Sequence, residues 1–185
     1  SLITADLDGD GIDEYLLLTK DKNLDSTFNF FKFDLFELYV WNPTKNEYSL
    51  NFIDTVYFGR NLTILGKNNR NQNIIDIQTF SGGEDSTLSI GRRLYGYSEH
   101  KTSILFSSDI GNPEKIDLDN DSNPEILIKG VSFFKLSPIK PIYYIKDIYK
   151  YSFDKYENYT PNYKWYFDKN NNILISLFPP EETIM

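Results

Sequence analysis

Short apolar runs alternate with polar turn segments along the chain. Tyr15–Leu18 and Ile126–Ile128 are continuous apolar runs, and each is followed within a few positions by a polar residue or a glycine. Phe36, Leu38 and Val40 instead alternate with their neighbours in the period of a half-buried strand. Runs this short, bounded by turn residues, are typical of strands, and sustained helical periodicity is absent. The pattern therefore predicts an all-β fold.

Two segments that precede apolar runs carry acidic residues at alternate positions. The first acidic loop, residues 6–14, reads Asp-Leu-Asp-Gly-Asp-Gly-Ile-Asp-Glu, and the second acidic loop, residues 117–125, reads Asp-Leu-Asp-Asn-Asp-Ser-Asn-Pro-Glu. Carboxylates spaced in this way can point to one centre, where without a cation they would repel one another. Calcium, which takes about six to eight oxygen ligands in flexible geometry, suits such a centre. We expect two calcium ions, held by Asp6, Asp8, Asp10, the Ile12 carbonyl and Glu14 in the first loop, and by Asp117, Asp119, Asp121, Asn123 and Glu125 in the second.

The nearest alternative is an EF-hand loop, which closes with a bidentate glutamate at its twelfth position and is flanked by helices. That position is Leu17 in the first loop and Ile128 in the second. Neither side chain can bind a cation, so the pattern excludes an EF-hand.

The first acidic loop resembles the calcium loop of FG-GAP and VCBS-type repeats, in which Asp-x-Asp-Gly-Asp-Gly-x-x-(Asp/Glu) precedes an apolar strand. Residues 6–18 follow this pattern closely. The second loop departs from it at Ser122, where the family has glycine, but shares Pro124 before the last acid. The resemblance implies β-propeller-like blades of antiparallel strands, as in integrin-α, with ions that brace loops and need not touch a partner.

The two loops mark an internal repeat. Half of their spacing is about 55 residues, close to one four-stranded blade with its loops. A degenerate copy is expected between them at residues 66–73, which lack the acids, followed by a strand at Ile74–Phe80. We therefore expect one domain over residues 1–185, with approximate repeats 1–60, 61–112 and 113–185. Three blades are too few to close a propeller, so either other sequence completes the ring or the strands form an open sheet or sandwich.

Composition narrows the class of partner. The formal charge is −8, and two divalent ions would leave the surface acidic, which disfavours nucleic acid and anionic membranes. No apolar run is long enough to span a bilayer, so membrane insertion is not expected. The chain has no cysteine, which excludes disulfides and thiolate metal sites but does not choose a compartment.

Localisation is predicted from the calcium loops. Exposed acidic loops are most useful where calcium is in the millimolar range, which favours a secreted, periplasmic or cell-surface protein. The sequons at Asn61 and Asn158 are compatible with secretion but are expected by chance in an Asn-rich chain. Ser1 is not a natural start, so we expect processing or truncation upstream.

Catalytic chemistry has little support in the sequence. His100 is the only histidine and lies between two predicted strands without a nucleophile motif, which favours a solvated turn. Glu84, Asp85 and Glu99 could in principle hydrolyse a glycoside, but no spacing singles them out from ordinary surface acids. We therefore predict no catalytic residues.

Tyrosines and a tryptophan are concentrated between residues 143 and 166. Such rings suit contact with glycans or proteins, although packing between strands explains most of them. The sequence predicts a non-enzymatic, calcium-stabilised interaction or adhesion module with a protein or glycan partner. A polysaccharide-acting or glycan-binding accessory domain, and a subunit that completes a larger β assembly with other chains, are the alternatives.

Overall fold

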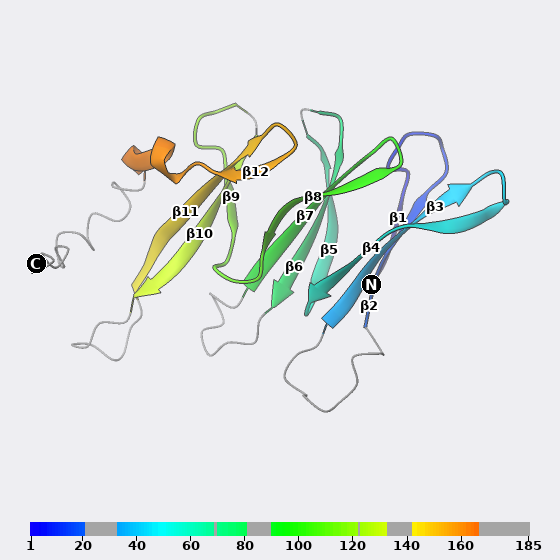
Figure 1. Ribbon diagram of the computed structural model, residues 1–185, viewed down its shortest axis with the longest axis horizontal. Coiled ribbons are helices and arrows are strands. Elements are labelled where there is room, and N and C mark those ends of the chain that lie inside the picture. Colours follow the sequence, from blue (N-terminus) through cyan, green and yellow to red (C-terminus); the bar gives the residue numbers. More distant parts are fainter. Residues whose placement is uncertain (21–32, 69, 81–89, 122, 133–141, 167–185) are drawn as a thin grey trace, which may run out of the picture. The chain divides into compact units, whose positions relative to one another are not determined.

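The computed structural model describes residues 1–20, 33–68, 70–80, 90–121, 123–132 and 142–166. Within them the protein is all-β, as predicted, with three separate four-stranded antiparallel sheets (Figure 1). Each sheet is an open meander, because its strands are adjacent in the order in which they occur along the chain. No helix among the described residues is long and apolar enough to cross a membrane.

The first sheet has the order β1-β2-β3-β4. Its strands are β1 (Leu2–Ala5), β2 (Glu14–Lys20), β3 (Phe33–Asn42) and β4 (Glu47–Tyr57). Burial alternates strictly along β2, where Glu14, Leu16 and Leu18 are buried and the residues between them are half-buried. The apolar run predicted as a strand therefore presents one face to a core.

The second sheet has the order β5-β6-β7-β8. Its strands are β5 (Arg60–Lys67), β6 (Asn73–Phe80), β7 (Ile90–Ser98) and β8 (Lys101–Ser108). The strand expected at residues 74–80 is β6, a central strand that pairs with β5 on one side and β7 on the other.

The third sheet has the order β12-β11-β10-β9. It consists of β9 (Glu114–Ile116), β10 (Glu125–Ser132), β11 (Ile142–Ser152) and β12 (Lys155–Asn158), and a 3₁₀ turn, η1 (Thr160–Tyr163), follows. The backbone N–H of Ile148 donates to Thr160 Oγ1 at 2.9 Å, which ties η1 to β11.

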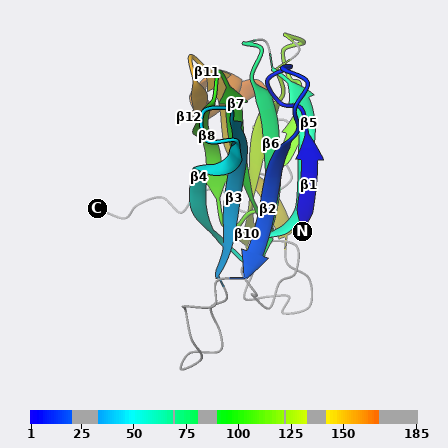
Figure 2. The ribbon, with the colours of Figure 1, turned by 90° about the vertical axis from the view of Figure 1, so that its right-hand side faces the viewer.

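The chain divides into two compact units, Ser1–Ile110 and Gly111–Met185. In the first unit the first and second sheets pack face to face through one core, and Figure 2 shows strands of the second sheet behind those of the first. Leu16, Phe36 and Leu38 from the first sheet meet Ile75 and Tyr95 from the second.

The second unit has a core of its own. Leu127 on β10, Ile148 on β11 and Tyr163 in η1 are buried together. The half-buried Tyr159 and Tyr166 pack against this cluster. Part of the tyrosine-rich segment therefore packs inside the unit, whereas Trp165 is exposed.

Candidate metal centres

The first acidic loop connects two paired strands, and this pairing brings its two ends together. β1 pairs with β2 in antiparallel register, with Ala5 opposite Glu14. Asp6 therefore starts the loop beside the glutamate that ends it, although the two residues are the first and ninth of the pattern. Gly9 and Gly11 both adopt a φ of 86°, a left-handed conformation that most side chains resist.

The loop's own carboxylates hold its backbone. Asp6 accepts hydrogen bonds from the N–H groups of Gly9 at 2.7 Å and Gly11 at 3.0 Å. Asp8 accepts from Asp10 N at 3.1 Å, and Asp10 accepts from Ile12 N at 2.7 Å. These hydrogen bonds within the loop hold the turn without a ligand.

Three of the predicted ligands converge. One carboxylate oxygen each from Asp6, Asp8 and Glu14 lies within 4.8 Å of the others. Glu14 is only 3% exposed and accepts the N–H of Leu7 at 2.6 Å. Asp10 is not part of the converging group, and its side chain and that of Ile12 line a neighbouring pocket instead.

The converging group concentrates negative charge. Burial raises the pKa of Glu14 despite the Leu7 hydrogen bond, and the charges of Asp8, Asp10 and Asp6 raise it further. Asp8 Oδ2 is buried and accepts no hydrogen bond. A buried oxygen without a donor, beside two more carboxylates, fits a site for a hard cation with oxygen ligands.

Two residues of the second sheet reach this loop, and sequence analysis did not identify them as part of the site. The Asn73 side chain, at the start of β6, donates a hydrogen bond to the Leu7 carbonyl. His100, in the turn between β7 and β8, places Nδ1 3.3 Å from Asp8 Oδ2. Both contacts join residues more than 60 positions apart, so no local pattern could have indicated them.

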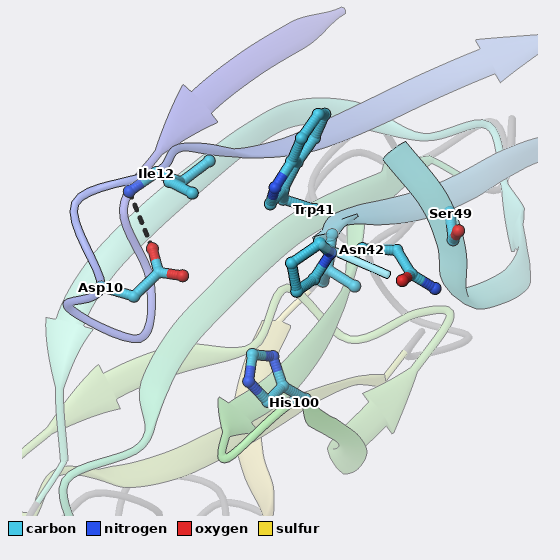
Figure 3. Close-up of a pocket in the computed structure, with 8 residues that line it drawn as sticks. Asp10, Ile12, Trp41, Asn42, Ser49 and His100 are labelled. Carbon is cyan, nitrogen blue, oxygen red and sulfur yellow. Dashed lines mark hydrogen bonds between the residues drawn. The ribbon is translucent and has the colours of Figure 1, made fainter. Parts of the chain in front are cut away.

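A pocket of about 410 Å³ opens beside the loop, within the first unit. In Figure 3, Asp10 and Ile12 lie on one side of it, Asn42 and Ser49 on the other, and Trp41 and His100 border it as well. Ser49 Oγ is buried without a hydrogen-bond partner.

The second acidic loop repeats the backbone arrangement of the first. Ile116 on β9 lies opposite Glu125 on β10, so the loop is again closed by an antiparallel pair. Leu118 N donates to Glu125 Oε2 at 2.8 Å, as Leu7 N does to Glu14. Asn120 has a φ of 60° where the first loop has Gly9. One oxygen each from Asp117, Asp119 and Glu125 again lies within 4.8 Å of the others.

A lysine distinguishes the second loop from the first. Lys150 Nζ, on β11, donates to Asp119 Oδ2 and, at 2.7 Å, to Asp121 Oδ2, and it lies 3.6 Å from Glu125 Oε1. The Lys150 hydrogen bonds lower the pKa of both aspartates. Burial alone would lower the pKa of Lys150, but the carboxylates raise it overall.

Tyr163 supplies further donor contacts to the second loop. Its hydroxyl is a hydrogen-bond donor that lies 2.9 Å from Asp119 Oδ2 and 2.8 Å from Glu125 Oε1. The ring is 6% exposed in the core of the second unit, which holds the hydroxyl in place.

The other sequence candidates are placed as follows. Glu84 and Asp85 lie outside the described residues. Glu99 lies in the turn beside His100 with a φ of 49° and is exposed.

No protein-family model, no curated protein and no solved structure matches the chain. The class of protein is therefore defined by its open antiparallel sheets and its two acidic loops alone.

Proposed function

We propose that this chain is a calcium-stabilised, non-enzymatic repeat module that acts in extracellular or cell-surface interaction or adhesion. The observation that supports it best is the first acidic loop, where carboxylate oxygens of Asp6, Asp8 and Glu14 converge and Asp8 Oδ2 is buried without a hydrogen bond. Bound calcium would neutralise these carboxylates and fix the β1–β2 connection against the second sheet.

The chemistry of the ligands favours calcium over other metals. Carboxylate oxygens suit hard cations, whereas copper, zinc and nickel favour sites with imidazole or thiolate ligands. Magnesium demands near-octahedral geometry and gives up its water reluctantly, while calcium accepts irregular sets of oxygen ligands. A short, glycine-containing loop with three converging carboxylates fits the irregular oxygen coordination that calcium accepts.

The same calcium site supports an extracellular location and a stabilising, non-catalytic role. Weak acidic calcium loops of this kind are occupied at millimolar calcium, which is an extracellular condition. A bound ion would act on the fold, because ligand binding to the native state alone stabilises it. The interaction partner in this proposal is a protein or a glycan.

Thermal unfolding in excess calcium, in chelator and in magnesium tests the proposal. At about 100 times its dissociation constant, calcium would add about 2.7 kcal/mol, or roughly 5–10 °C in Tm. Asp8→Ala should abolish this shift. Asp13→Ala is the matched control, because Asp13 lies between the predicted ligand positions and the substitution keeps its backbone carbonyl, which accepts from Tyr48 Oη at 3.1 Å. Equal shifts in the two variants, or no shift in the unchanged protein, would refute the calcium proposal.

Glycan binding is the second candidate function, and the pocket beside the first loop favours it. Trp41 offers an aromatic surface, and Asp10, Asn42 and Ser49 offer polar groups around it. Sugar rings present an apolar face and hydroxyls in this combination, and the volume of about 410 Å³ accommodates a small saccharide.

Titration against a glycan panel tests the second candidate. Trp41→Ala should abolish binding, whereas Trp165→Ala, which removes the exposed tryptophan of the other unit, should not change it. Retention of binding in Trp41→Ala would place the glycan site elsewhere.

A further inference from the structure

We infer that the second acidic loop is a cation site filled by the protein's own Lys150, so that calcium binds at the first loop alone. This inference rests on the proposed calcium site of the first loop. It narrows the two ions predicted from sequence to one, and it assigns Lys150 as an internal replacement for the second ion.

The position of the ammonium group supports the assignment. Nζ contacts one oxygen from each of Asp119, Asp121 and Glu125, the acids at the third, fifth and ninth positions of the loop. In the calcium pattern these positions provide ligands for the ion. A lysine ammonium is a compact point charge with three donors, and it can therefore satisfy three carboxylates around one centre.

Burial makes this arrangement more than a surface ion pair. The Glu125 side chain is completely buried and that of Lys150 is 21% exposed. A carboxylate removed from water in this way is costly unless it is paired and hydrogen-bonded. Glu125 has Leu118 N, Tyr163 Oη and Lys150 around it.

In the described part of the first sheet no lysine or arginine reaches the first loop, and the ionisable group beside it is His100 of the second sheet, whose Nδ1 lies 3.3 Å from Asp8 Oδ2. Tyr15 on β2 lies opposite Tyr39 on β3, and Ile126 on β10 lies opposite Tyr149 on β11. The next residue along is Val40 in the first sheet and Lys150 in the third. The same register thus directs an apolar side chain toward one loop and an ammonium group toward the other.

Two backbone features are common to both loops and do not account for the difference. Both loops turn through a left-handed residue at the fourth position, and both end in a buried glutamate that accepts the N–H of the second residue. Calcium could enter the second loop only by displacing a charge that is tethered to the same sheet. A tethered group acts at a high effective concentration, which disfavours its replacement by a weakly held ion.

Calcium titration calorimetry on the full chain, with calcium chloride as the probe, tests this inference. The unchanged protein should bind one ion, and Asp8→Ala should bind none. Lys150→Met should bind two, because it frees the carboxylates while keeping the stem volume. Lys146→Met removes an exposed lysine from the same strand and should leave the count at one. In chelator, Lys150→Met should unfold at a lower temperature than the unchanged protein, and calcium should restore it.

The outcomes separate this inference from the proposed function. Two ions in the unchanged protein, or one ion that persists in Asp8→Ala, would overturn the role of Lys150 while leaving calcium binding intact. A count of one in Lys150→Met would also overturn it. If neither the unchanged protein nor Lys150→Met binds an ion, both the role of Lys150 and the proposed calcium binding are refuted. If Lys150→Met fails to fold in chelator and in calcium, Lys150→Gln, which keeps a hydrogen-bond donor without the charge, must then show the second ion.

Discussion

The two acidic loops are closed in the same way and differ in what balances their charge. In each, an antiparallel strand pair closes the loop, and the final glutamate is buried and accepts the N–H of the second residue, at 2.6 Å in the first loop and 2.8 Å in the second. The first loop leaves a carboxylate oxygen of Asp8 buried without a hydrogen bond. The second has Lys150 and Tyr163 donating to its carboxylates.

The comparison shows that the spacing of acids in a loop predicts which oxygens lie together but not which group balances their charge. The two loops differ in one residue of the neighbouring strand, whose position is set by strand register. Val40 and Lys150 are the residues at that position, and neither lies in the loop sequence.

Glu125→Ala should cause the largest loss. It leaves the Leu118 N–H without its acceptor, removes one of the two acceptors near the Tyr163 hydroxyl and removes a buried partner of Lys150. We expect the free energy of unfolding to fall by about 3–5 kcal/mol. Urea unfolding in a Trp41→Phe background, where Trp165 reports the second unit, measures it. Glu157→Ala, which removes only a pair with Lys155 at 3.8 Å, should cost under about 1 kcal/mol. Equal losses would contradict the role of Glu125.

Glu14→Gln should act in opposite directions with and without calcium. Because burial and neighbouring acids raise the pKa of Glu14, its ionised form destabilises the metal-free fold. The destabilising contribution of Glu14 to the metal-free fold should therefore be absent below about pH 4.5 and should grow as the pH rises through the raised pKa. Glutamine cannot ionise, so the variant should be more stable than the unchanged protein in chelator at pH 7.

The same variant should lose the calcium response of about 2.7 kcal/mol, because a ligand carboxylate is gone. Denaturant unfolding in chelator and in calcium measures both effects. A variant that is less stable in chelator, or that keeps the full calcium response, would contradict the charge argument for the first loop.

Tyr163→Phe should cost about 1.5 kcal/mol. The ring stays packed against Leu127 and Ile148, and only the hydroxyl is lost, whose single proton has Asp119 and Glu125 as its acceptors. Hydrogen bonds to charged groups contribute about this much. Tyr39→Phe removes a hydroxyl that donates to Glu37 at 3.2 Å in the other unit, and it should leave the stability of the second unit unchanged.

The smallest expected effect is on acid stability. Hydrogen bonds from Lys150 lower the pKa of Asp119 and Asp121, so their contribution is present above about pH 3.8 and is lost as the pH falls toward the lowered values. Trp165 fluorescence between pH 5 and pH 2 should show this loss, and Lys150→Met should lessen it. If Trp165 fluorescence depends on pH in the same way in both proteins, Lys150 does not lower the pKa of these aspartates.

The fold class could be predicted from local patterns. Apolar runs after each acidic loop became β2 and β10, and the degenerate middle loop is followed by β6. Alternate spacing predicted that the carboxylates of the first loop share one centre, and the β1–β2 pair brings those of Asp6, Asp8 and Glu14 together; their role as metal ligands stays a prediction.

The remainder of both sites depends on distant residues. His100 and Asn73 reach the first loop from another sheet, and Lys150 and Tyr163 reach the second from β11 and η1. Their positions depend on sheet packing and strand register, which spacing within the loops does not encode. Asp10, also predicted as a ligand by spacing, is not among the three converging carboxylates; it accepts the Ile12 N–H and lines the pocket, and its role as a ligand stays a prediction.

A crystal structure of the full chain grown in calcium, with an anomalous difference map, tests the central claim most directly. We predict one calcium peak, bounded by Asp6, Asp8 and Glu14, and the Lys150 ammonium among Asp119, Asp121 and Glu125. A calcium peak in the second loop with Lys150 turned away, or no peak in the first loop at saturating calcium, would contradict it.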